Sequence, residues 1–240
     1  MEEENFIEFK CPYCAEAVAF AADFEGRAEE CPHCAESLVI PSAGAEFGIK
    51  LPIPISTPRL VLRRFTFGDV ESLVDLGADD SADDGWFSWC KEEDVVQKWI
   101  ESTTQESLTR GDYAITLAIA LLSNDRPIGR VSIRCWEATR LQANLGVSIG
   151  AKYHQQGYET EALQGVCSFC FDGIALHRVA ISCECTRVAA RKTIENAGLR
   201  LEGEFLEDNF CDGEWLGTAW YAMLESEYRA LRPPPPKSQT

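Results

Sequence analysis

Four cysteines near the start of the chain have the spacing of a metal site. Cys11 and Cys14 form one C-x-x-C pair, Cys31 and Cys34 form a second, and sixteen residues separate the pairs. Each pair turns two sulfur atoms toward one point, and two such turns complete the tetrahedron of thiolates that Zn2+ prefers. We therefore predict that these four residues hold a structural zinc ion. Four thiolates leave no open coordination position, so this site is not itself catalytic.

The segment around these cysteines is too short to bury much of a core. Val18 and Phe20 alternate as in a strand, and Glu25 and Gly26 can turn the chain into a second strand that leads to Cys31. Metal binding would then supply most of the folding free energy, which is about 10–16 kcal/mol in zinc-finger peptides. Residues 9–41 resemble the zinc-ribbon family, with alanine after each knuckle where many ribbons have glycine. A redox pair or an iron centre is the alternative use of these cysteines.

Charge and composition limit the kinds of partner. The 240 residues carry a net charge of −17, with 39 acidic and 22 basic side chains. Such a surface repels nucleic acid and anionic lipid and favours cationic partners, such as amines or basic protein tails. The alternative is that the acidity only maintains solubility.

Nothing in the sequence indicates export or membrane insertion. The start, M-E-E-E, is acidic where a signal peptide is basic, and the longest apolar run, residues 114–122, is too short to span a bilayer. We therefore expect a cytoplasmic protein. In a reducing compartment, metal binding and burial explain eleven cysteines better than disulfides do.

Proline-rich segments divide the chain. We expect a zinc ribbon over residues 6–41, a semi-rigid linker over 42–56, one larger domain over 57–228 and a proline-rich tail over 229–240. In the larger domain, apolar periodicity predicts a mixture of strands and helices. The expected strands are 60–65, 113–122, 128–136, 143–149, 178–185, 201–206 and 218–224, and the expected helices start at Thr66 and span 94–106, 160–174 and 188–197.

Four further cysteines fall on apolar faces. Cys167 and Cys170 also have C-x-x-C spacing, but they lie on the apolar stripe of the helix expected over 160–174. Cys183 and Cys185 alternate with apolar residues along a strand. We interpret all four as packing residues rather than metal ligands.

A glycine turn in residues 154–162 joins a strand to a helix. Successive backbone N–H groups in such a turn, together with the positive end of the helix, form an anion site. Around this turn the chain resembles the GNAT acetyltransferases, and in particular the RimJ/RimL-like branch that acetylates N-terminal amines of ribosomal proteins. The segments that carry this resemblance are T-P-R-L-V-L-R from Thr57, L-G-V-S-I from Leu145, Q-G-Y-E-T-E-A-L from Gln156, R-K-T-I-E-N-A-G-L from Arg191 with L-E-G from Leu201, and the terminal pair D-G-E-W and W-Y-A-M-L from Asp212 and Trp220.

The resemblance implies an α/β (α+β) fold of the GNAT type, with a mixed central sheet flanked by helices, preceded here by the small zinc ribbon. It implies that acetyl-CoA binds where the central strand separates from its neighbour and that a free amine attacks the acetyl group directly. Backbone from the central strand would pair with the pantetheine arm and polarise the acetyl carbonyl, and the glycine turn would hold the pyrophosphate. The residues so assigned to acetyl-CoA are Val147, Ser148, Ile149, Gln155, Gln156, Gly157, Tyr158, Glu159, Thr160 and Arg187.

Five positions depart from the pattern of that branch. His154 stands where the branch has glutamine or arginine, and Glu159 stands where it has a small residue. Asn144 replaces an acidic residue, Arg187 replaces an asparagine, and Ala190 replaces a serine. The serine is the usual candidate for protonating the leaving thiolate, which Ala190 cannot do. Arg187 could instead contact a phosphate of CoA. Because the pKa of the CoA thiol is not far above neutral, we expect slower rather than absent catalysis.

No catalytic acid or base can be assigned from the sequence. Tyr221, Glu204 and Glu207 lie on or near strands that could border the cleft, and His177 lies just before a strand, but we interpret these side chains as structural or solvated rather than catalytic. Arg63 and Arg64 could contact cofactor or substrate, but a solvated strand end is the simpler interpretation. The leading hypothesis is an N-acetyltransferase that acts on a primary amine. The amine is either a protein N-terminus, which could belong to a basic protein, or a small amine. The alternative is a non-catalytic acetyl-CoA-binding or scaffold protein whose ribbon recruits a partner. Nucleic-acid binding by the ribbon is a third hypothesis, which the net charge disfavours.

Overall fold

The computed structural model describes residues 6–11, 16–21, 24, 28–35, 37–39, 53–78, 86–104, 113–135, 141–211 and 213–231. None of the helices in these ranges is long and apolar enough to cross a membrane.

Two short antiparallel hairpins make up the described N-terminal residues. The predicted strands around Val18 and before Cys31 both form, as β2 and β3. Their predicted pairing was wrong, because β2 pairs with a strand before it and β3 with a strand after it. The earlier strand alternates Ile7 and Phe9 with Glu8 and Lys10, but it precedes Cys11 and so lies outside the segment between the cysteine pairs where the hairpin was predicted. The four strands are β1 (Phe6–Lys10), β2 (Ala17–Ala21), β3 (Ala28–Glu30) and β4 (Ser37–Val39).

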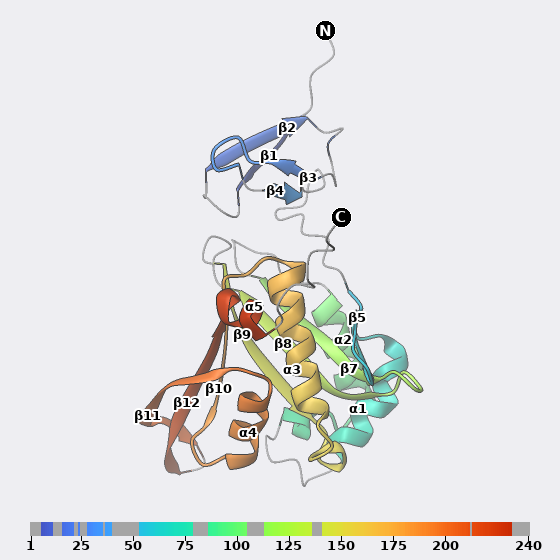
Figure 1. The fold of residues 1–240 in the computed structure, drawn as a ribbon. Helices are drawn as coiled ribbons and strands as arrows, with labels where there is room; N and C mark the ends of the chain where they lie inside the picture. The colour runs from blue at the N-terminus through green and yellow to red at the C-terminus, as the bar shows by residue number, and fades with distance from the viewer. Residues whose placement is uncertain are drawn as a thin grey trace, which may run out of the picture.

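One mixed eight-stranded sheet forms the centre of the larger unit (Figure 1). Its strand order is β11-β12-β10-β9-β8-β7-β6-β5, and all neighbours are antiparallel except β9 and β10, which are parallel. The strands are β5 (Ile55–Ser56), β6 (Leu60–Arg63), β7 (Tyr113–Leu121), β8 (Pro127–Cys135), β9 (Gln142–Ile149), β10 (Arg178–Glu184), β11 (Arg200–Cys211) and β12 (Glu214–Leu224).

Helices cover both faces of this sheet. One core cluster packs α3 against one face of the sheet, to which alternate residues of the strands contribute. Leu117 and Val131 belong to this cluster and are fully buried. The other cluster joins α1, η3 and α2 to the opposite face through Ala118. This alternation follows from the two-residue period of a strand. The helices are α1 (Val70–Gly77), α2 (Glu93–Thr104), α3 (Tyr158–Ser168), α4 (Val188–Asn196) and α5 (Glu225–Leu231), with short turns η2 (Phe67–Asp69), η3 (Trp86–Trp89), η5 (Ala151–Tyr153) and η6 (Phe169–Gly173).

Local sequence signals fixed several of these ends. The capping box predicted at Thr66 forms with Asp69 and starts the turn before α1. Gly198 was expected to end the helix before it. It follows Ala197, the C-cap residue of α4, and has φ +101°. The helix predicted over 160–174 begins earlier, at Tyr158, and its last turn is the π-helical η6.

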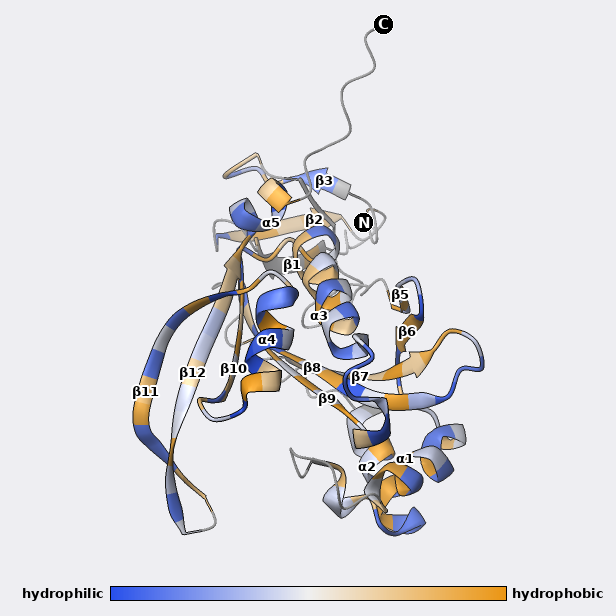
Figure 2. Cartoon of the chain, turned by 60° about the horizontal axis from the view of Figure 1, so that its bottom comes forward, coloured by the Kyte–Doolittle hydropathy of each residue, from blue (hydrophilic) through white to orange (hydrophobic). Residues whose placement is uncertain are grey.

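The last hairpin is longer than predicted. β11 and β12 continue well past the expected 201–206 and 218–224, and β11 is exposed along nearly its whole length. Figure 2 shows this hairpin extending beyond α4 at the edge of the sheet. Apolar periodicity underestimated the two strands because neither face of their outer part is buried, so no alternation is required there.

Candidate functional site

The sheet opens where its two parallel strands part. β9 and β10 pair only from Gln142↔Arg178 to Leu145↔Ile181. Beyond these residues β9 stays paired with β8, and β10 stays paired with β12. The facing edges of Gly146–Ser148 and Ser182–Cys183 therefore face a gap rather than pair with each other, whereas the carbonyls of Ile149 and Glu184 accept from His154 Nε2 and from the N–H of Arg187. Such groups are satisfied by a ligand that can hydrogen-bond like a strand.

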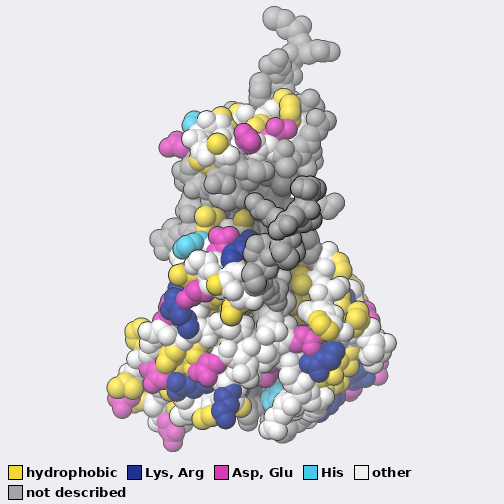
Figure 3. All heavy atoms as spheres, in the orientation of Figure 1, with side chains coloured by type: hydrophobic (Ala, Val, Ile, Leu, Met, Phe, Trp, Pro, Cys, Tyr) yellow, Lys and Arg dark blue, Asp and Glu magenta, His cyan; other side chains and the backbone are white. Residues whose placement is uncertain are grey.

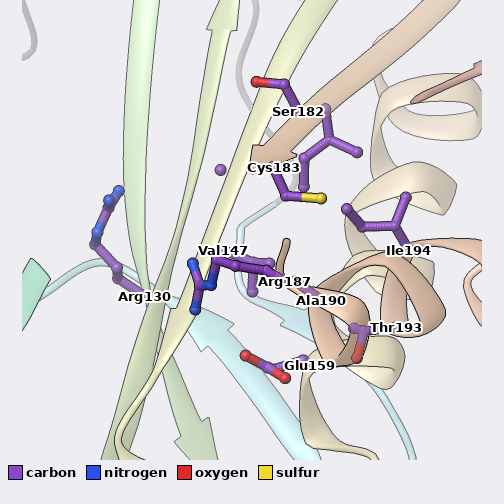
Figure 4. Close-up of a pocket in the computed structure, with 11 residues that line it drawn as sticks. Arg130, Val147, Glu159, Ser182, Cys183, Arg187, Ala190, Thr193 and Ile194 are labelled. Carbon is purple, nitrogen blue, oxygen red and sulfur yellow. The ribbon is translucent and has the colours of Figure 1, made fainter. Parts of the chain in front are cut away.

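A pocket occupies this gap and continues between α3 and α4 (Figure 4). Its lining includes two arginines, Arg130 and Arg187, and one carboxylate, Glu159. In Figure 4, Arg130 lies on β8, on the side of the pocket away from Thr193 and Ile194, and Glu159 lies at the start of α3. The complete lining is Arg130, Gly146, Val147, Glu159, Ile181, Ser182, Cys183, Arg187, Ala190, Thr193 and Ile194.

The turn that precedes α3 has the backbone shape of an anion site. Gln155 and Gly157 both have positive φ, +59° and +77°. Gly157 is the N-cap residue of α3, and no side chain caps this helix start. The first N–H groups of a helix have no intrahelical acceptor, so here they are available to an anion and reinforced by the helix dipole.

His154 supports the turn instead of facing the anion site. Its Nε2 lies 2.8 Å from the carbonyl oxygen of Ile149, at the end of β9. Because a carbonyl only accepts, Nε2 carries the proton. The adjacent Gln156 donates from Nε2 to the carbonyl of Lys152 at 3.0 Å. The His154 side chain therefore ties the turn to the end of β9, and the Gln156 side chain ties it to the short η5 segment.

The residues assigned to acetyl-CoA occupy four kinds of position. Val147, Glu159 and Arg187 line the pocket. Thr160 donates to the carbonyl of Thr193, a lining residue, at 3.5 Å. Ser148 and Ile149 are buried in β9. The others, Gln155, Gln156, Gly157 and Tyr158, form the turn and the first residue of α3.

Two residues at departures from the family pattern are located by the structure. Ala190 lines the pocket from the first turn of α4, so the position without a hydroxyl faces the gap. Asn144 pairs with Ala180 one residue before the strands part. Cys183, predicted to be a packing residue, packs against the main core cluster and also lines the pocket. Burial raises the pKa of this thiol, although the charges of Arg191 and Arg187 act in the opposite direction.

The proposed acid and base candidates lie outside the lining. Tyr221 is fully buried, and its hydroxyl is 2.9 Å from Nε of Arg191, which also binds Glu204 at 2.5 Å. Burial raises the pKa of Tyr221 despite the neighbouring guanidinium. Glu207 is exposed on β11, and His177 lies at the opposite end of β10 from the pocket. These positions support the structural interpretation of all four side chains.

Two strand-end arginines differ in their contacts. Arg63 binds both carboxylate oxygens of Asp69 at 2.8 Å and Oδ1 of Asp125 at 2.7 Å. It therefore holds the start of α1 to the β7–β8 turn and is not a solvated strand end. Arg64 is exposed.

Three of the four N-terminal cysteines converge. The Sγ atoms of Cys11, Cys31 and Cys34 all lie within 4.8 Å of one another, and Cys11 and Cys34 are 3.7 Å apart. Cys14 lies outside the described residues. Ala35 adopts φ +61°, the left-handed conformation that glycine adopts most easily after a knuckle.

Comparison with known proteins agrees with this geometry. The family model described as acetyltransferase (GNAT) domain matches residues 59–200. The chain is 25% identical over 174 residues to the uncharacterized N-acetyltransferase YnaD of Bacillus subtilis (strain 168), covering 72% of this chain and 98% of that one. It therefore has the predicted α/β class and GNAT fold.

Solved structures are similar over the same part of the chain. A provisionally assigned ribosomal-protein-serine acetyltransferase from Vibrio cholerae is 25% identical with a TM-score of 0.61, covering 72% of this chain and 98% of that one. The ribosomal-protein alpha-N-acetyltransferase RimL, solved in complex with coenzyme A, is 21% identical with a TM-score of 0.60, covering 72% and 97%.

Proposed function

This chain belongs to the GNAT acetyltransferase family and is an acetyl-CoA-dependent N-acetyltransferase, and we propose that its acceptor is the α-amine of a protein N-terminus or a small primary amine. In the reaction the amine nitrogen bonds to the acetyl carbonyl carbon, the bond to the CoA sulfur breaks, and the nitrogen loses a proton.

The observation that carries the assignment of the site is the gap between β9 and β10. Beyond Leu145 and Ile181 its two edges no longer pair with each other, and the start of α3, which no side chain caps, contributes Glu159 to the pocket. The pantetheine arm of CoA contains two amides and can pair with such an edge as a strand would. Backbone of Val147 would hold that arm, and N–H groups from Gln156 to Thr160 would hold the pyrophosphate.

The charges of the lining fit a polyanionic cosubstrate. Arg130 and Arg187 outnumber Glu159, the single carboxylate in the lining. Glu159 and Arg187 both line the pocket, so the arginine can offset the charge that would otherwise oppose the phosphates. We propose that Arg187 contacts a phosphate of CoA.

Departure of CoA can proceed without a dedicated acid. Ala190 faces the gap and offers no proton. A thiol has a pKa of roughly 8.5, so the thiolate is a stable leaving group near neutral pH. We expect turnover to be slower than with a hydroxyl at this position rather than lost.

The β11–β12 hairpin supports a basic protein as the acceptor. It starts beside the pocket, where the N–H of Cys185 donates to the carbonyl of Gly217 at 2.8 Å. Its outer part exposes Leu206, Phe210 and Trp215, with exposed fractions of 84%, 58% and 61%. Figure 3 shows hydrophobic and acidic side chains together over this corner of the molecule.

The acidic side chains of this outer part are not neutralised locally. Glu207, Asp208 and Glu214 form no ion pair with any other described residue. A cationic and partly apolar polypeptide would complement them, and a nucleic acid would not. This complementarity favours a basic N-terminal segment over a small neutral amine.

The converging cysteines support the proposed zinc ribbon. Three thiols within 4.8 Å supply three ligands, and Cys14, in the same C-x-x-C as Cys11, is the candidate for the fourth. All-thiolate ligation selects zinc over calcium or magnesium. We propose that this closed site is structural and that the ribbon presents a surface to a partner protein.

Titration of the zinc-loaded chain with acetyl-CoA, followed by an amine panel, tests the proposal. We expect one-to-one binding by calorimetry and acetylation of peptides with a basic N-terminal segment in preference to the same peptides with acidic residues. Binding without turnover of any amine would favour the non-catalytic alternative, which the presence of Ala190 in the gap also supports. Absence of binding by folded protein would overturn the site.

A further inference from the structure

The turn before α3 adopts a conformation that its own residues do not favour. Gln155 has a side chain and yet has φ +59°, and Gly157 follows with φ +77°. Left-handed backbone is uncommon for residues other than glycine. No side chain caps α3, and contacts from a distant segment add to the local hydrogen bonds of His154 and Gln156 in holding the turn.

A carboxylate in the first turns of α3 receives such contacts. Glu161 accepts hydrogen bonds from Thr57 Oγ1 at 2.6 Å, from the backbone N–H of Arg59 at 2.7 Å and from Arg59 Nε at 2.6 Å. Its side chain is 13% exposed. Burial works against ionisation, but these donors outweigh it and hold the pKa of Glu161 below its usual range. The segment between β5 and β6 is therefore fixed to the start of α3.

Arg59 extends this contact to the turn itself. Its Nη1 donates to the carbonyl oxygen of Gln156 at 3.0 Å, and its guanidinium carbon lies 4.4 Å from the centre of the Tyr158 ring. One side chain thus contacts the residue before Gly157, the residue after it, and Glu161. We call this set of four residues, Arg59, Gln156, Tyr158 and Glu161, the Arg59 clasp.

The clasp determines which way a peptide plane of the turn faces. In a trans peptide the C=O and the following N–H point in opposite directions. Arg59 holds the Gln156 carbonyl toward itself, so the N–H of Gly157 points away from Arg59. We propose that Arg59 is a positioning residue that presents the N–H groups of this turn to the pyrophosphate of acetyl-CoA. This inference rests on the proposed role of the turn in cosubstrate binding.

A second arginine provides a matched control at the other end of the same helical segment. Arg229 binds Asp172, in η6 after α3, at 2.5 Å, and its guanidinium lies 5.7 Å from the Tyr228 ring. Its exposed fraction is 51%, against 47% for Arg59. Both arginines therefore combine a carboxylate, an aromatic ring and a similar exposure, but Arg229 touches no residue of the turn.

The test compares a ligand that has the pyrophosphate with one that lacks it. Acetyl-CoA carries the pyrophosphate within its 3′-phospho-ADP group, and S-acetylpantetheine lacks that whole group. We expect Arg59→Ala to weaken acetyl-CoA binding by about tenfold or more, the usual effect of losing a hydrogen bond in a charged network. Binding of S-acetylpantetheine should stay unchanged. Calorimetry measures the first ligand and NMR shift titration the weaker second one.

Further variants separate positioning from charge and from folding. Arg59→Lys keeps the charge but not the fork, so we expect it to lose most of the same affinity. Arg229→Ala should lower thermal stability as much as Arg59→Ala and leave both affinities unchanged. Retention of acetyl-CoA affinity in Arg59→Lys, or equal loss for both ligands, would overturn the clasp. Failure of the wild-type chain to bind acetyl-CoA would instead overturn the proposed site, and the clasp with it.

Discussion

Two C-x-x-C pairs of this chain have the same spacing in different surroundings. Cys31 and Cys34 gather with Cys11 into a group of thiols within 4.8 Å, whereas Cys167 and Cys170 are 1% and 0% exposed in the core beneath α3. Burial works to raise the pKa of Cys31, but backbone hydrogen bonds and neighbouring thiols lower it to about 6. Burial raises the pKa of Cys170 well above its usual value. On a turn this spacing makes sulfurs converge, and on a helix it places them on one apolar face.

The same contrast separates the two parts of the molecule. The buried cluster of the N-terminal hairpins consists, among the described residues, of Ile7, Val18, Cys11 and Cys31, two of which are proposed metal ligands. The sheet is held by two extensive apolar clusters, one on each face. Stability of the first part should therefore depend on metal, and stability of the second on burial.

Removal of zinc should produce the largest effect. We expect chelation, or Cys31→Ala, to unfold the N-terminal hairpins, because metal binding supplies about 10–16 kcal/mol in comparable small domains. Metal analysis and NMR of the hairpin resonances measure this. The melting of the sheet and its affinity for acetyl-CoA should not change. Intact hairpins without metal would show that burial alone holds both parts.

A smaller effect is expected from the second pair. Cys170→Ala removes one buried sulfur, which should lower the free energy of unfolding of the sheet by about 1 kcal/mol through lost packing. Denaturant unfolding measures this loss. The bound zinc should stay at the wild-type amount, whereas Cys31→Ala abolishes it. Loss of zinc in Cys170→Ala would mean that the second pair is also a ligand.

Acid should separate the two parts with the smallest change in free energy. Hydrogen bonds from Arg178 lower the pKa of Glu202 to about 2, so this carboxylate stabilises the sheet above its unfolded pKa of 4.5 and ceases to do so as the pH falls toward 2. Protons compete with zinc for the cysteine thiolates, so the N-terminal hairpins should release their metal before Glu202 is protonated. We expect Glu202→Gln to flatten the stability of the sheet between pH 4.5 and 2 in urea titrations. An unchanged slope would assign the acid sensitivity to other carboxylates.

The sequence anticipated much of the fold because local rules operate along most of the chain. Alternation located β7, β8 and β9, and the glycine turn located α3. Prediction failed where the partner was distant or absent. β2 has a candidate strand on either side of it, and alternation within each strand does not say which one it pairs with. The outer parts of β11 and β12 bury neither face.

For the site, the sequence supplied the residue types but not their directions. Periodicity placed Cys183 among packing residues, which is confirmed, but it did not reveal that Cys183 also lines the gap, because β9 and β10 have already parted at that point. Arg59 and Glu161 are 102 residues apart. No local pattern links them, and only the packing of α3 against the β5–β6 segment reveals their contact.

The sequence by itself therefore determined the family, the glycine turn and the four-cysteine spacing, because each depends on neighbours along the chain. The tertiary structure alone decided where the parallel strands part, which side chains line the gap and what holds the turn in its left-handed conformation. These depend on contacts between distant segments, whose geometry is set by the packing of the whole sheet and its helices.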